Sequence, residues 1–366
     1  MRLNGTTYSP QGLLDFIQSE QQKRLLPPWE QALFDLLRAW FGPDATLTLK
    51  TSGSTGPPKL IRAEKARMEA SARATLDHLN IAPGGKGLLI LPTTHIAGVM
   101  MVVRALVGEL DLIPMAPGRR LTWQDLPDRR YDLLAATPSQ LLGMVGQGGD
   151  GGLLEKIGSL LVGGAAPSPH LERLLSCGPN PIHVTYGMTE TLSHVALRRL
   201  APGPAQSSYQ GLPGVQFSQG EAGQLIIQAP ALLDGPLTTR DRVELISSTA
   251  FRWLSRLDHV INSGGIKIHP EVVERALAPL MATWQKNYLI AGVEDERLGE
   301  SVTLYLEGEG VTPSEEAAIL AACRKLCPPY EAPRQIVAVP AFVQTASGKW
   351  DRIKTLQQEK KCDHLV

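Results

Sequence analysis

The sequence predicts an α/β protein with a large N-terminal domain, built on a mainly parallel sheet and carrying a small β-rich subdomain, and a C-terminal α+β domain. Between about residues 47 and 186, short apolar runs alternate with segments of helical character, which is typical of parallel strands joined by helices. After residue 209 the pattern changes to short extended pieces, and a glycine hairpin followed by helices and strands comes later. We therefore expect residues 1–256 to form the first domain and residues 257–366 the second, which has a common domain size.

Length and composition narrow the class of protein. A chain of 366 residues can bury a large core without metals or disulfides. Its 36 basic residues equal its 36 acidic residues and form no long run, so nothing indicates a nucleic-acid partner or an anionic membrane surface. The four cysteines include no C-x-x-C pair, which argues against a structural zinc site and a disulfide framework. The N-terminus lacks signal-peptide order and the most apolar stretch is interrupted by charges, so we expect a cytoplasmic protein without a membrane span.

Four of the expected strands end where small or polar residues begin. These runs are LLIL (88–91), YDLLAA (131–136), SLLVGG (159–164) and HVTYG (183–187). The carboxyl ends of parallel strands meet at one edge of an open sheet, which is where ligands usually bind. We therefore expect the binding site along this edge.

The later elements are shorter. The runs GQLIIQAP, RVELI and FRWLSRL predict strands of the β-rich subdomain. The run INSGGIKI predicts a hairpin, and a helix should begin near Pro270. Two strands and a helix around 313–327 complete the expected C-terminal domain.

The segment TSGSTGPPK (51–59) combines hydroxyls, glycines and one lysine behind the strand-like run TLTLK. Backbone N–H groups and hydroxyls of such a loop can surround a polyphosphate while Lys59 adds positive charge. Because Lys59 follows Gly56 by three positions and precedes Leu60, the loop is not a Walker A sequence, and a P-loop kinase or GTPase is disfavoured. Taken alone, the stretch is also typical of a flexible surface loop.

Six motifs in order along most of the chain resemble those of the adenylate-forming superfamily of acyl-CoA ligases, adenylation domains and luciferases. They are TSGSTGPPK (51–59), GGA (163–165), YGMTE (186–190), RD (240–241), SRLD with the hairpin after it (255–268) and TASGK (345–349). The resemblance implies an ATP-dependent ligase that forms an acyl-AMP and pyrophosphate and then passes the acyl group to a thiol. It also implies ATP, Mg²⁺ and coenzyme A as cofactor and co-substrates.

The resemblance assigns a larger set of residues to ATP binding. They are Thr51, Ser52, Gly53, Ser54, Thr55, Gly56 and Lys59 at the phosphates, Gly163, Gly164, Ala165, Tyr186, Gly187 and Met188 near the adenine, Asp241 at the ribose, and Arg256.

Lys349, Glu190 and Thr189 are the implied catalytic residues. An attacking carboxylate and the α-phosphate are both anionic, so nucleotidyl transfer needs positive charge at the transition state. Lys349 and a Mg²⁺ held through Glu190 would supply it, and Thr189 would add a hydroxyl. Taken singly, Glu190 could be a helix-start carboxylate, Tyr186 a core aromatic and Lys349 a solvated turn residue.

The resemblance further implies that residues 257–366 form a mobile domain that swings about Asp258. One orientation would bring Lys349 to ATP and the acid. The other would bring Gly264 and Gly265 to a channel for coenzyme A.

The segment LPTTHIAGVMMVVR (91–104) resembles the acid-pocket segment of the superfamily, which makes His95 a candidate substrate residue. A lone histidine on an apolar helix is more often a core residue. Arg104 follows MMVV on what reads as a buried helix, and an unpaired buried guanidinium is costly. Its partner is either Glu109 or Asp111, or a carboxylate of the substrate.

The H-x-x-G arrangement followed by arginine, and the run TYGMTETLSHVALR, resemble the o-succinylbenzoate–CoA ligases of menaquinone biosynthesis, particularly their compact forms. That acid carries one carboxylate to be activated and one to be recognised, which gives Arg104 a purpose. Ser193 and His194 are further candidates for the same pocket.

The pattern also departs from the superfamily. Only 50 residues precede the phosphate loop, so we expect a reduced N-terminal subdomain. The ribose motif reads Thr-Thr-Arg-Asp in place of Thr-Gly-Asp, and Ser255 replaces the hinge glycine. Two other functions remain open: an adenylation enzyme for another small or aryl acid with a CoA or carrier-protein acceptor, and a catalytically silent nucleotide-binding relative.

Overall fold

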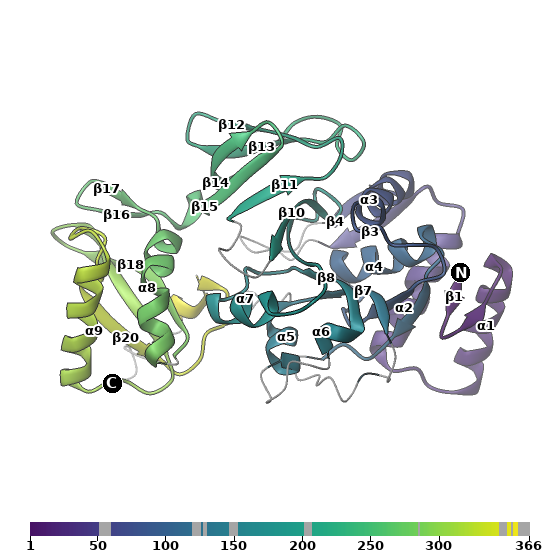
Figure 1. Ribbon diagram of the computed structural model, residues 1–366, viewed down its shortest axis with the longest axis horizontal. Helices are drawn as coiled ribbons and strands as arrows, with labels where there is room; N and C mark the ends of the chain where they lie inside the picture. Colours follow the sequence, from purple (N-terminus) through teal and green to yellow (C-terminus); the bar gives the residue numbers. More distant parts are fainter. Residues whose placement is uncertain are drawn as a thin grey trace. The chain divides into compact units, whose positions relative to one another are not determined.

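The computed structural model describes residues 1–50, 60–118, 126, 130–145, 153–200, 207–284, 286–343, 350–352 and 354–357. The chain divides into two compact units. Unit 1 contains residues 1–216 and 228–237, and unit 2 contains residues 217–227 and 238–366. Both mix helices with strands, and the predicted α/β fold class is confirmed (Figure 1).

Unit 1 is built on a sheet with the strand order β11-β10-β9-β8-β7-β5-β6-β1-β2. The strands are β1 (Arg2–Leu3), β2 (Thr6–Thr7), β5 (Lys86–Leu89), β6 (Asp111–Pro114), β7 (Tyr131–Ala136), β8 (Ile157–Val162), β9 (Ile182–Gly187), β10 (His194–Leu200) and β11 (Ser208–Gly211). The series from β9 to β1 is parallel, and β10 runs antiparallel to β9. The parallel sheet expected from the apolar runs is therefore present.

Helices cover both faces of this sheet. They are α1 (Pro10–Lys23), α2 (Pro28–Phe41), α3 (Lys65–His78), α4 (Ile96–Val107), α5 (Pro138–Val145), α6 (Leu153–Lys156) and α7 (Pro169–Ser176). Alternate strand residues such as Leu88 and Leu134 share one core with α5, α6 and α7. A Cβ built on the intervening Gly87 would lie 2.9 Å from Cε of Met101 on α4, which covers the other face. Burial on both faces explains the near-continuous apolar runs.

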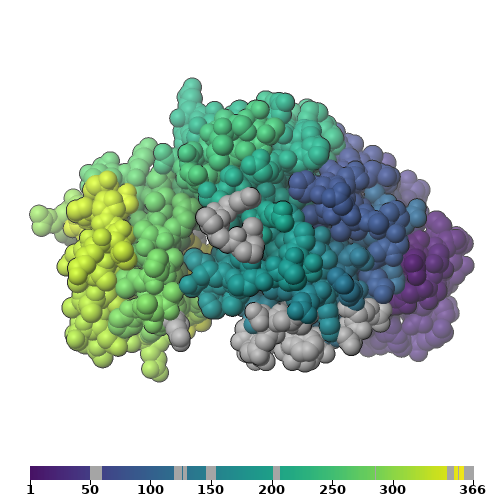
Figure 2. All heavy atoms as spheres, viewed as in Figure 1, coloured from purple at the N-terminus to yellow at the C-terminus, as the bar shows by residue number. Residues whose placement is uncertain are grey.

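A separate two-stranded sheet flanks the phosphate-loop sequence. β3 (Thr46–Lys50) pairs with β4 (Leu60–Glu64) in antiparallel register, with Lys50 opposite Leu60. Residues of β3, β4, α3 and α4 form one core cluster. Figure 2 shows these N-terminal residues, in purple and blue, as a continuous packed surface of unit 1.

Unit 2 contains two groups of strands. The first has the order β12-β13-β14-β15, and the second β17-β16-β19-β18 with β20 paired to β19. The elements are β12 (Gln216–Gln219), β13 (Gln224–Gln228), β14 (Leu237–Ser247), β15 (Ala250–Arg256), a 3-10 turn η2 (Leu257–His259), β16 (Ile261–Ser263), β17 (Ile266–Ile268), α8 (Pro270–Trp284), β18 (Tyr288–Asp295), β19 (Gly299–Glu307), α9 (Pro313–Leu326) and β20 (Gln335–Val339). Helices α8 and α9 pack with β18 and β19 around one apolar core.

The local signals of unit 2 match the observed boundaries. Gly264 and Gly265 have φ values of +60° and +82°, which lets the hairpin between β16 and β17 turn tightly. Helix α9 begins with a capping box in which Thr312 and Glu315 bond to each other's backbone N–H groups. No helix in the described part of the chain combines the length and apolarity that a membrane crossing requires.

Candidate active site

Two predicted motifs lie at the carboxyl ends of neighbouring parallel strands. Gly163, Gly164 and Ala165 follow β8, while Tyr186 and Gly187 end β9 and lead to Met188, Thr189 and Glu190. Strands β8 and β9 pair in parallel, with Val162 opposite Val184. Both motifs therefore reach the same edge of the sheet, which is the edge where ligands of open α/β sheets bind.

Close approach explains two of the glycines. A Cβ on Gly163 would lie 2.6 Å from Oγ1 of Thr185 on β9. A Cβ on Gly187 would lie 2.0 Å from the carbonyl oxygen of Ser193, which follows the loop after β9. Neither position has room for a side chain, so glycine is required for this backbone arrangement.

Thr191, which the sequence did not single out, holds the loop between β9 and β10. It is completely buried, and its Oγ1 accepts a hydrogen bond from the N–H of Met188 (3.0 Å). The same hydroxyl donates to the carbonyl oxygen of Ser193 (2.6 Å). The signal in the sequence was the second threonine of the T-E-T run. In the loop so held, Thr189 is buried and Glu190 is exposed.

Glu190 presents its carboxylate on the surface, and it makes no hydrogen bond or ion pair within the described residues. A single carboxylate of this kind suits Mg²⁺, which keeps several waters and takes further ligands from substrate phosphates. No cluster of three or more His, Cys, Asp or Glu side chains in the described ranges forms a metal site. The donor chemistry thus fits a magnesium ion that arrives with ATP.

Tyr186 has an aromatic neighbour. Its ring centroid lies 5.7 Å from that of Tyr209 on β11, with the planes inclined at 59°. The guanidinium of Arg198 lies 5.7 Å from the Tyr209 centroid and donates to Glu172 of α7 (3.2 Å). Tyr186 itself is partly exposed.

His95 lies at the N-cap position of α4, just before the helix and not on it as the sequence suggested. Its backbone is extended, with φ −120° and ψ 150°, and its ring does not cap the helix. Burial lowers the pKa of the imidazole below its usual value. Gly98 makes the entry into α4 possible, because a Cβ there would lie 2.3 Å from the carbonyl oxygen of Pro92. The H-x-x-G spacing therefore has a steric cause.

Arg104 is buried on α4, with only 2% of its surface exposed. Its Nη2 donates to Oγ of Ser193 (2.7 Å) and lies 3.5 Å from Nδ1 of His194. Its Nε is buried and has no hydrogen-bond partner in the described part of the chain. Burial lowers the pKa of the guanidinium to about 10. The structure thus brings together Arg104 and Ser193, which the sequence placed in one acid pocket.

The alternative in which Glu109 or Asp111 neutralises Arg104 is wrong for the described chain. Asp111 instead accepts a hydrogen bond from the N–H of Gly5 (2.8 Å). No described carboxylate lies within ion-pair distance of Arg104; its recorded partners are Ser193 and His194.

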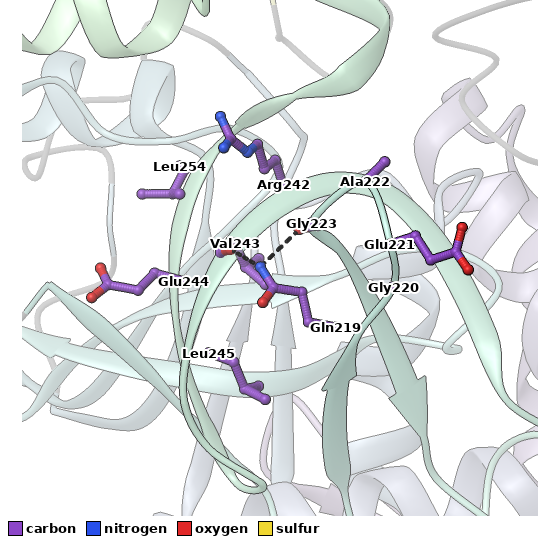
Figure 3. A pocket seen from close by; sticks show the side chains of 10 residues that line it. All are labelled: Gln219, Gly220, Glu221, Ala222, Gly223, Arg242, Val243, Glu244, Leu245 and Leu254. Carbon is purple, nitrogen blue, oxygen red and sulfur yellow. Dashed lines mark hydrogen bonds between the residues drawn. The ribbon is translucent and has the colours of Figure 1, made fainter.

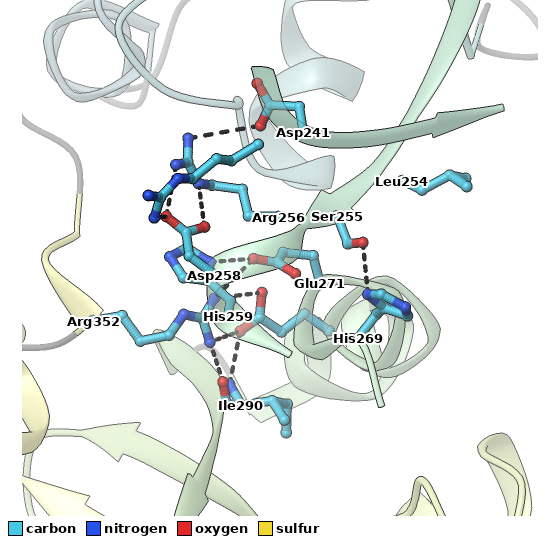
Figure 4. A network of polar contacts seen from close by, with 12 residues as sticks. Asp241, Leu254, Ser255, Arg256, Asp258, His259, His269, Glu271, Ile290 and Arg352 are labelled. Carbon is cyan, nitrogen blue, oxygen red and sulfur yellow. Dashed lines mark hydrogen bonds and ion pairs between the residues drawn. The ribbon is translucent and has the colours of Figure 1, made fainter. Parts of the chain in front are cut away.

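In unit 2, Asp241, Arg256 and Asp258 form a chain of charged contacts (Figure 4). Arg256 donates from Nε and Nη2 to the two carboxylate oxygens of Asp258, at 2.8 Å each. Its Nη1 lies 3.7 Å from Oδ1 of the buried Asp241. Burial raises the pKa of Asp258, but the bonds from Arg256 outweigh it and hold that pKa below its usual value. The predicted ribose residue and the predicted hinge residue therefore share one arginine.

Ser255, which stands where the superfamily has glycine, is completely buried and bonded to His269 (Figure 4). Nδ1 of His269 lies 2.8 Å from Oγ of Ser255, and Nε2 lies 2.7 Å from Nη1 of Arg242. A guanidinium only donates, so Nε2 accepts and Nδ1–H donates to Ser255. The serine that replaces the superfamily's glycine therefore has its own hydrogen-bond partner.

A second network surrounds Arg352, which follows the predicted catalytic lysine by three residues (Figure 4). Nη1 of Arg352 donates to Oε1 of Glu274 (2.8 Å) and to the carbonyl oxygen of Ile290. Nη2 lies 3.9 Å from Oε1 of Glu271, which is also 2.5 Å from Nδ1 of His259. This network was not predicted from the sequence. Its signal was the P-E-V-V-E run, which puts two acids one turn apart on α8.

A hollow of about 510 Å³ lies in unit 2 between the β12–β13 turn, β14 and β15. Figure 3 shows the side chains that line it. Gln219 crosses it and donates from Nε2 to the carbonyl oxygens of Gly223 (3.3 Å) and Val243 (2.6 Å). None of the predicted site residues lines it. The hollow therefore gives no support to a ligand site.

Several predicted residues lie outside the described ranges. They are Thr51, Ser52, Gly53, Ser54, Thr55, Gly56 and Lys59 of the phosphate loop, and Lys349. Their roles, and those of Gly264 and Gly265 at the hairpin tip, stay predictions.

Comparison with known proteins adds evidence of kinship. The model of the family described as AMP-binding enzyme matches residues 35–235, more than half of the chain. The probable 2-succinylbenzoate–CoA ligase of Mycobacterium tuberculosis is 30% identical over 353 residues, covering 89% of this chain and 88% of the relative. The 2-succinylbenzoate–CoA ligase of Enterococcus faecalis is 26% identical and covers 85% of this chain and 69% of its own length.

Solved structures are similar as well. An acyl-CoA synthetase (AMP-forming)/AMP-acid ligase II-like protein from Dyadobacter fermentans is 31% identical, with a TM-score of 0.61 and coverage of 96% of this chain and 98% of its own. O-succinylbenzoate coenzyme A synthetase from Bacillus subtilis, in complex with ATP and magnesium, is 20% identical, with a TM-score of 0.70 and coverage of 84% and 69%. At that identity the second likeness supports the fold alone.

Proposed function

The chain belongs to the family of AMP-binding enzymes, and on this premise we propose that its acid substrate is 2-succinylbenzoate, which it converts to the CoA thioester. It is an AMP-forming acid–CoA ligase. In this reaction a carboxylate attacks the α-phosphate of ATP and pyrophosphate leaves. The acyl-AMP then passes its acyl group to the thiol of coenzyme A and releases AMP.

The proposed acid rests on one observation: Arg104 is buried, and no described carboxylate neutralises its charge. An arginine without an anion in a protein interior costs several kcal/mol of desolvation, on the order of the penalty known for buried ions. Arg104 has no carboxylate partner in the described ranges, while Ser193 holds one edge of its guanidinium. 2-Succinylbenzoate has a second carboxylate that is not activated and can supply the missing charge. A monocarboxylic acid cannot.

For ATP we propose the edge of the unit 1 sheet. Gly163, Gly164 and Ala165 would pass beside the adenine, and Tyr186, which ends β9 at the same edge, would contribute its ring. Glu190 would hold Mg²⁺, because its carboxylate is exposed and uncommitted in the described chain. When bound, the magnesium supplies charge stabilisation at the phosphates. Thr189 would add a hydroxyl there, and Asp241 would accept the ribose hydroxyls.

We also propose that residues 257–366 move about Asp258 between two half-reactions. Lys349 would serve only adenylate formation, where negative charge builds between carboxylate and phosphate. Lys349→Ala should therefore stop pyrophosphate release while a supplied acyl-AMP is still transferred to coenzyme A. Measurement of the two half-reactions separately checks this, and normal pyrophosphate release would remove Lys349 from catalysis.

An acid panel tests the proposed substrate. The purified chain is assayed for thioester formation with ATP, Mg²⁺ and coenzyme A, using 2-succinylbenzoate, benzoate and a fatty acid. We expect 2-succinylbenzoate to be preferred strongly over both monocarboxylates. Adenylate formation without thioester would indicate a carrier protein as the acceptor, and preference for a monocarboxylate would reject the proposed acid.

A further inference from the structure

His194 is buried directly behind Arg104 and has a neighbour at each ring nitrogen. It begins β10 and is 5% exposed. Its Nδ1 lies 3.5 Å from Nη2 of Arg104 and 3.4 Å from Oγ of Ser193. Its Nε2 lies 3.0 Å from Oγ1 of Thr75 on α3. The ring therefore connects α3 to the buried guanidinium.

The hydrogen bonds of Thr75 fix the tautomer of this ring. The Thr75 hydroxyl has one proton, and it donates that proton to the carbonyl oxygen of Ser71 one helical turn earlier (3.0 Å). Its oxygen must then accept from Nε2–H of His194, which leaves the lone pair on Nδ1. In the opposite tautomer Nδ1–H would face a guanidinium that can only donate, with Oγ of Ser193 at 3.4 Å as its acceptor. The bond to Thr75, which is the shorter contact at 3.0 Å, therefore selects neutral His194 with its proton on Nε2.

The charges around His194 keep the ring neutral. Among the described residues, the charged and titratable groups that act on it are Arg104 on α4, His78 on α3 and His183 on β9, and none of these is a carboxylate. The rings of His78 and His183 lie 6.0 Å apart in an edge-to-face arrangement. Burial first, and then these basic neighbours, place the pKa of His194 well below its usual value. Nδ1 of His194 therefore remains a hydrogen-bond acceptor beside Arg104 at neutral pH.

We propose that His194 is a positioning residue for acid recognition: held by Thr75 in the Nε2–H tautomer, it turns its lone pair to Nη2 of Arg104 and, with Ser193, fixes the guanidinium for the free carboxylate of the substrate. The proposal rests on the proposed function for its substrate. Beyond that function, the proposal adds a series of contacts from Thr75 through His194 to Arg104, which acts on the free carboxylate of the substrate and not on the reacting one. Preorganisation of this kind strengthens binding because the arginine need not be ordered when the acid arrives.

Kinetics of matched variants test this series of contacts. His194→Leu should raise the KM for 2-succinylbenzoate about tenfold or more, as expected when a charged group loses a hydrogen bond, while the KM for ATP stays within about twofold. His194→Asn keeps an oxygen acceptor near the Nδ1 position and should recover most of the loss. His170→Leu removes an exposed histidine of α7 that is not among the groups acting on His194, and should leave both KM values near wild type.

Thr75 provides a second test that does not depend on replacing the His194 ring. Thr75→Val removes the hydroxyl but keeps the shape, and should raise the KM for the acid by a smaller factor, while Thr75→Ser should resemble wild type. Nitrogen NMR shifts of labelled histidine in the free protein report the tautomer directly. We expect protonated Nε2 for His194 in wild type and a mixed tautomer in Thr75→Val.

The two readouts separate the proposals. An Nδ1–H tautomer in wild type, or unchanged KM for 2-succinylbenzoate in His194→Leu and Thr75→Val, would overturn the positioning role. Failure of wild type to make a thioester from 2-succinylbenzoate would reject the proposed acid alone, because the tautomer of the free protein does not depend on it.

Discussion

Arg104 in unit 1 and Arg352 in unit 2 are both largely shielded from solvent, Arg104 with 2% of its surface exposed and the Arg352 side chain with 16%, but their charges are compensated in opposite ways. Arg352 bonds to Glu274 and lies near Glu271, and these carboxylates raise its pKa although burial alone would lower it. Arg104 has a hydroxyl and a neutral imidazole, and burial lowers its pKa to about 10. The Arg352 site contains its own carboxylates, whereas the described residues around Arg104 include none.

The difference distinguishes a charge that stabilises the fold from a charge that can bind a ligand. An arginine that pairs with two carboxylates has its charge neutralised within the protein, and its removal leaves those carboxylates unpaired. A buried arginine held only by neutral groups is incomplete until a ligand supplies the charge. Substitution of the two arginines should therefore affect different properties of the protein.

The largest effect should follow from Arg352→Met. The substitution removes the ion-pair partner of Glu274 and leaves Glu271 with His259 alone. The Arg352–Glu274 pair is largely but not fully shielded, at 16% and 21% exposure, so the loss of stability should approach the figure of about 3–5 kcal/mol that is typical of buried pairs. We expect a lower urea midpoint and an equal loss of activity with every acid. Arg252→Met, which breaks an exposed pair with Glu244, is the matched control and should cost about 1 kcal/mol or less.

A double variant sharpens this test. Arg352→Met with Glu274→Gln removes both charges, so part of the lost stability should return. A midpoint for Arg352→Met within error of wild type would mean that the network contributes nothing to unit 2.

The second effect should be on specificity. Arg104→Met removes the charge that the second carboxylate needs, and kcat/KM for 2-succinylbenzoate should fall by the equivalent of about 2–5 kcal/mol. Reaction with a monocarboxylate of similar shape should change little, and the melting temperature should stay equal or rise because an uncompensated buried charge is gone. Equal losses for both acids with a lowered melting temperature would contradict a substrate role and give Arg104 the structural character of Arg352.

The smallest effect concerns acid pH. Burial raises the pKa of Glu271, but the bond with His259 and the charge of Arg352 lower it more, so the net pKa lies below its ordinary 4.5. The folded state then binds fewer protons than the unfolded state, and this share of stability is full above about pH 4.5 and is lost as the pH falls through the folded-state pKa. Unfolding midpoints between pH 3 and 6 should therefore drop less steeply for Glu271→Gln than for wild type. Identical slopes would exclude Glu271 from acid stability.

Local patterns predicted the central parallel strands of unit 1 and much of unit 2. Apolar runs at 88–91, 131–136, 159–164 and 183–187 correspond to β5, β7, β8 and β9, because burial on both faces of a parallel sheet leaves a continuous apolar signature. Strand β20 was missed, since the half-buried run QIVAV is stabilised by pairing with the distant β19. Pairing of this kind is not encoded in local periodicity.

The candidate site divides in the same way. Residue chemistry and order in the sequence indicated Arg104, Ser193 and the edge motifs, because charge, hydroxyl and glycine each have a direct chemical consequence. The sequence could not decide between Asp111 and a ligand as the partner of Arg104, since both choices satisfy the rule that buried charges are paired. It also could not assign Thr75, which lies 119 residues from His194 along the chain.

The sequence by itself therefore determined the class of fold and the groups available for chemistry, because these depend on periodicity and residue type, and its motifs indicated the family through their resemblance to known members. Only the tertiary structure decided which groups are partners. Arg352 pairs with Glu274 and Glu271, and Asp111 accepts from the N–H of Gly5. Arg104 contacts Ser193 and His194. The reason is that a hydrogen bond or ion pair acts over a few ångströms in space, whereas the residues that form it are separated by tens of positions along the chain.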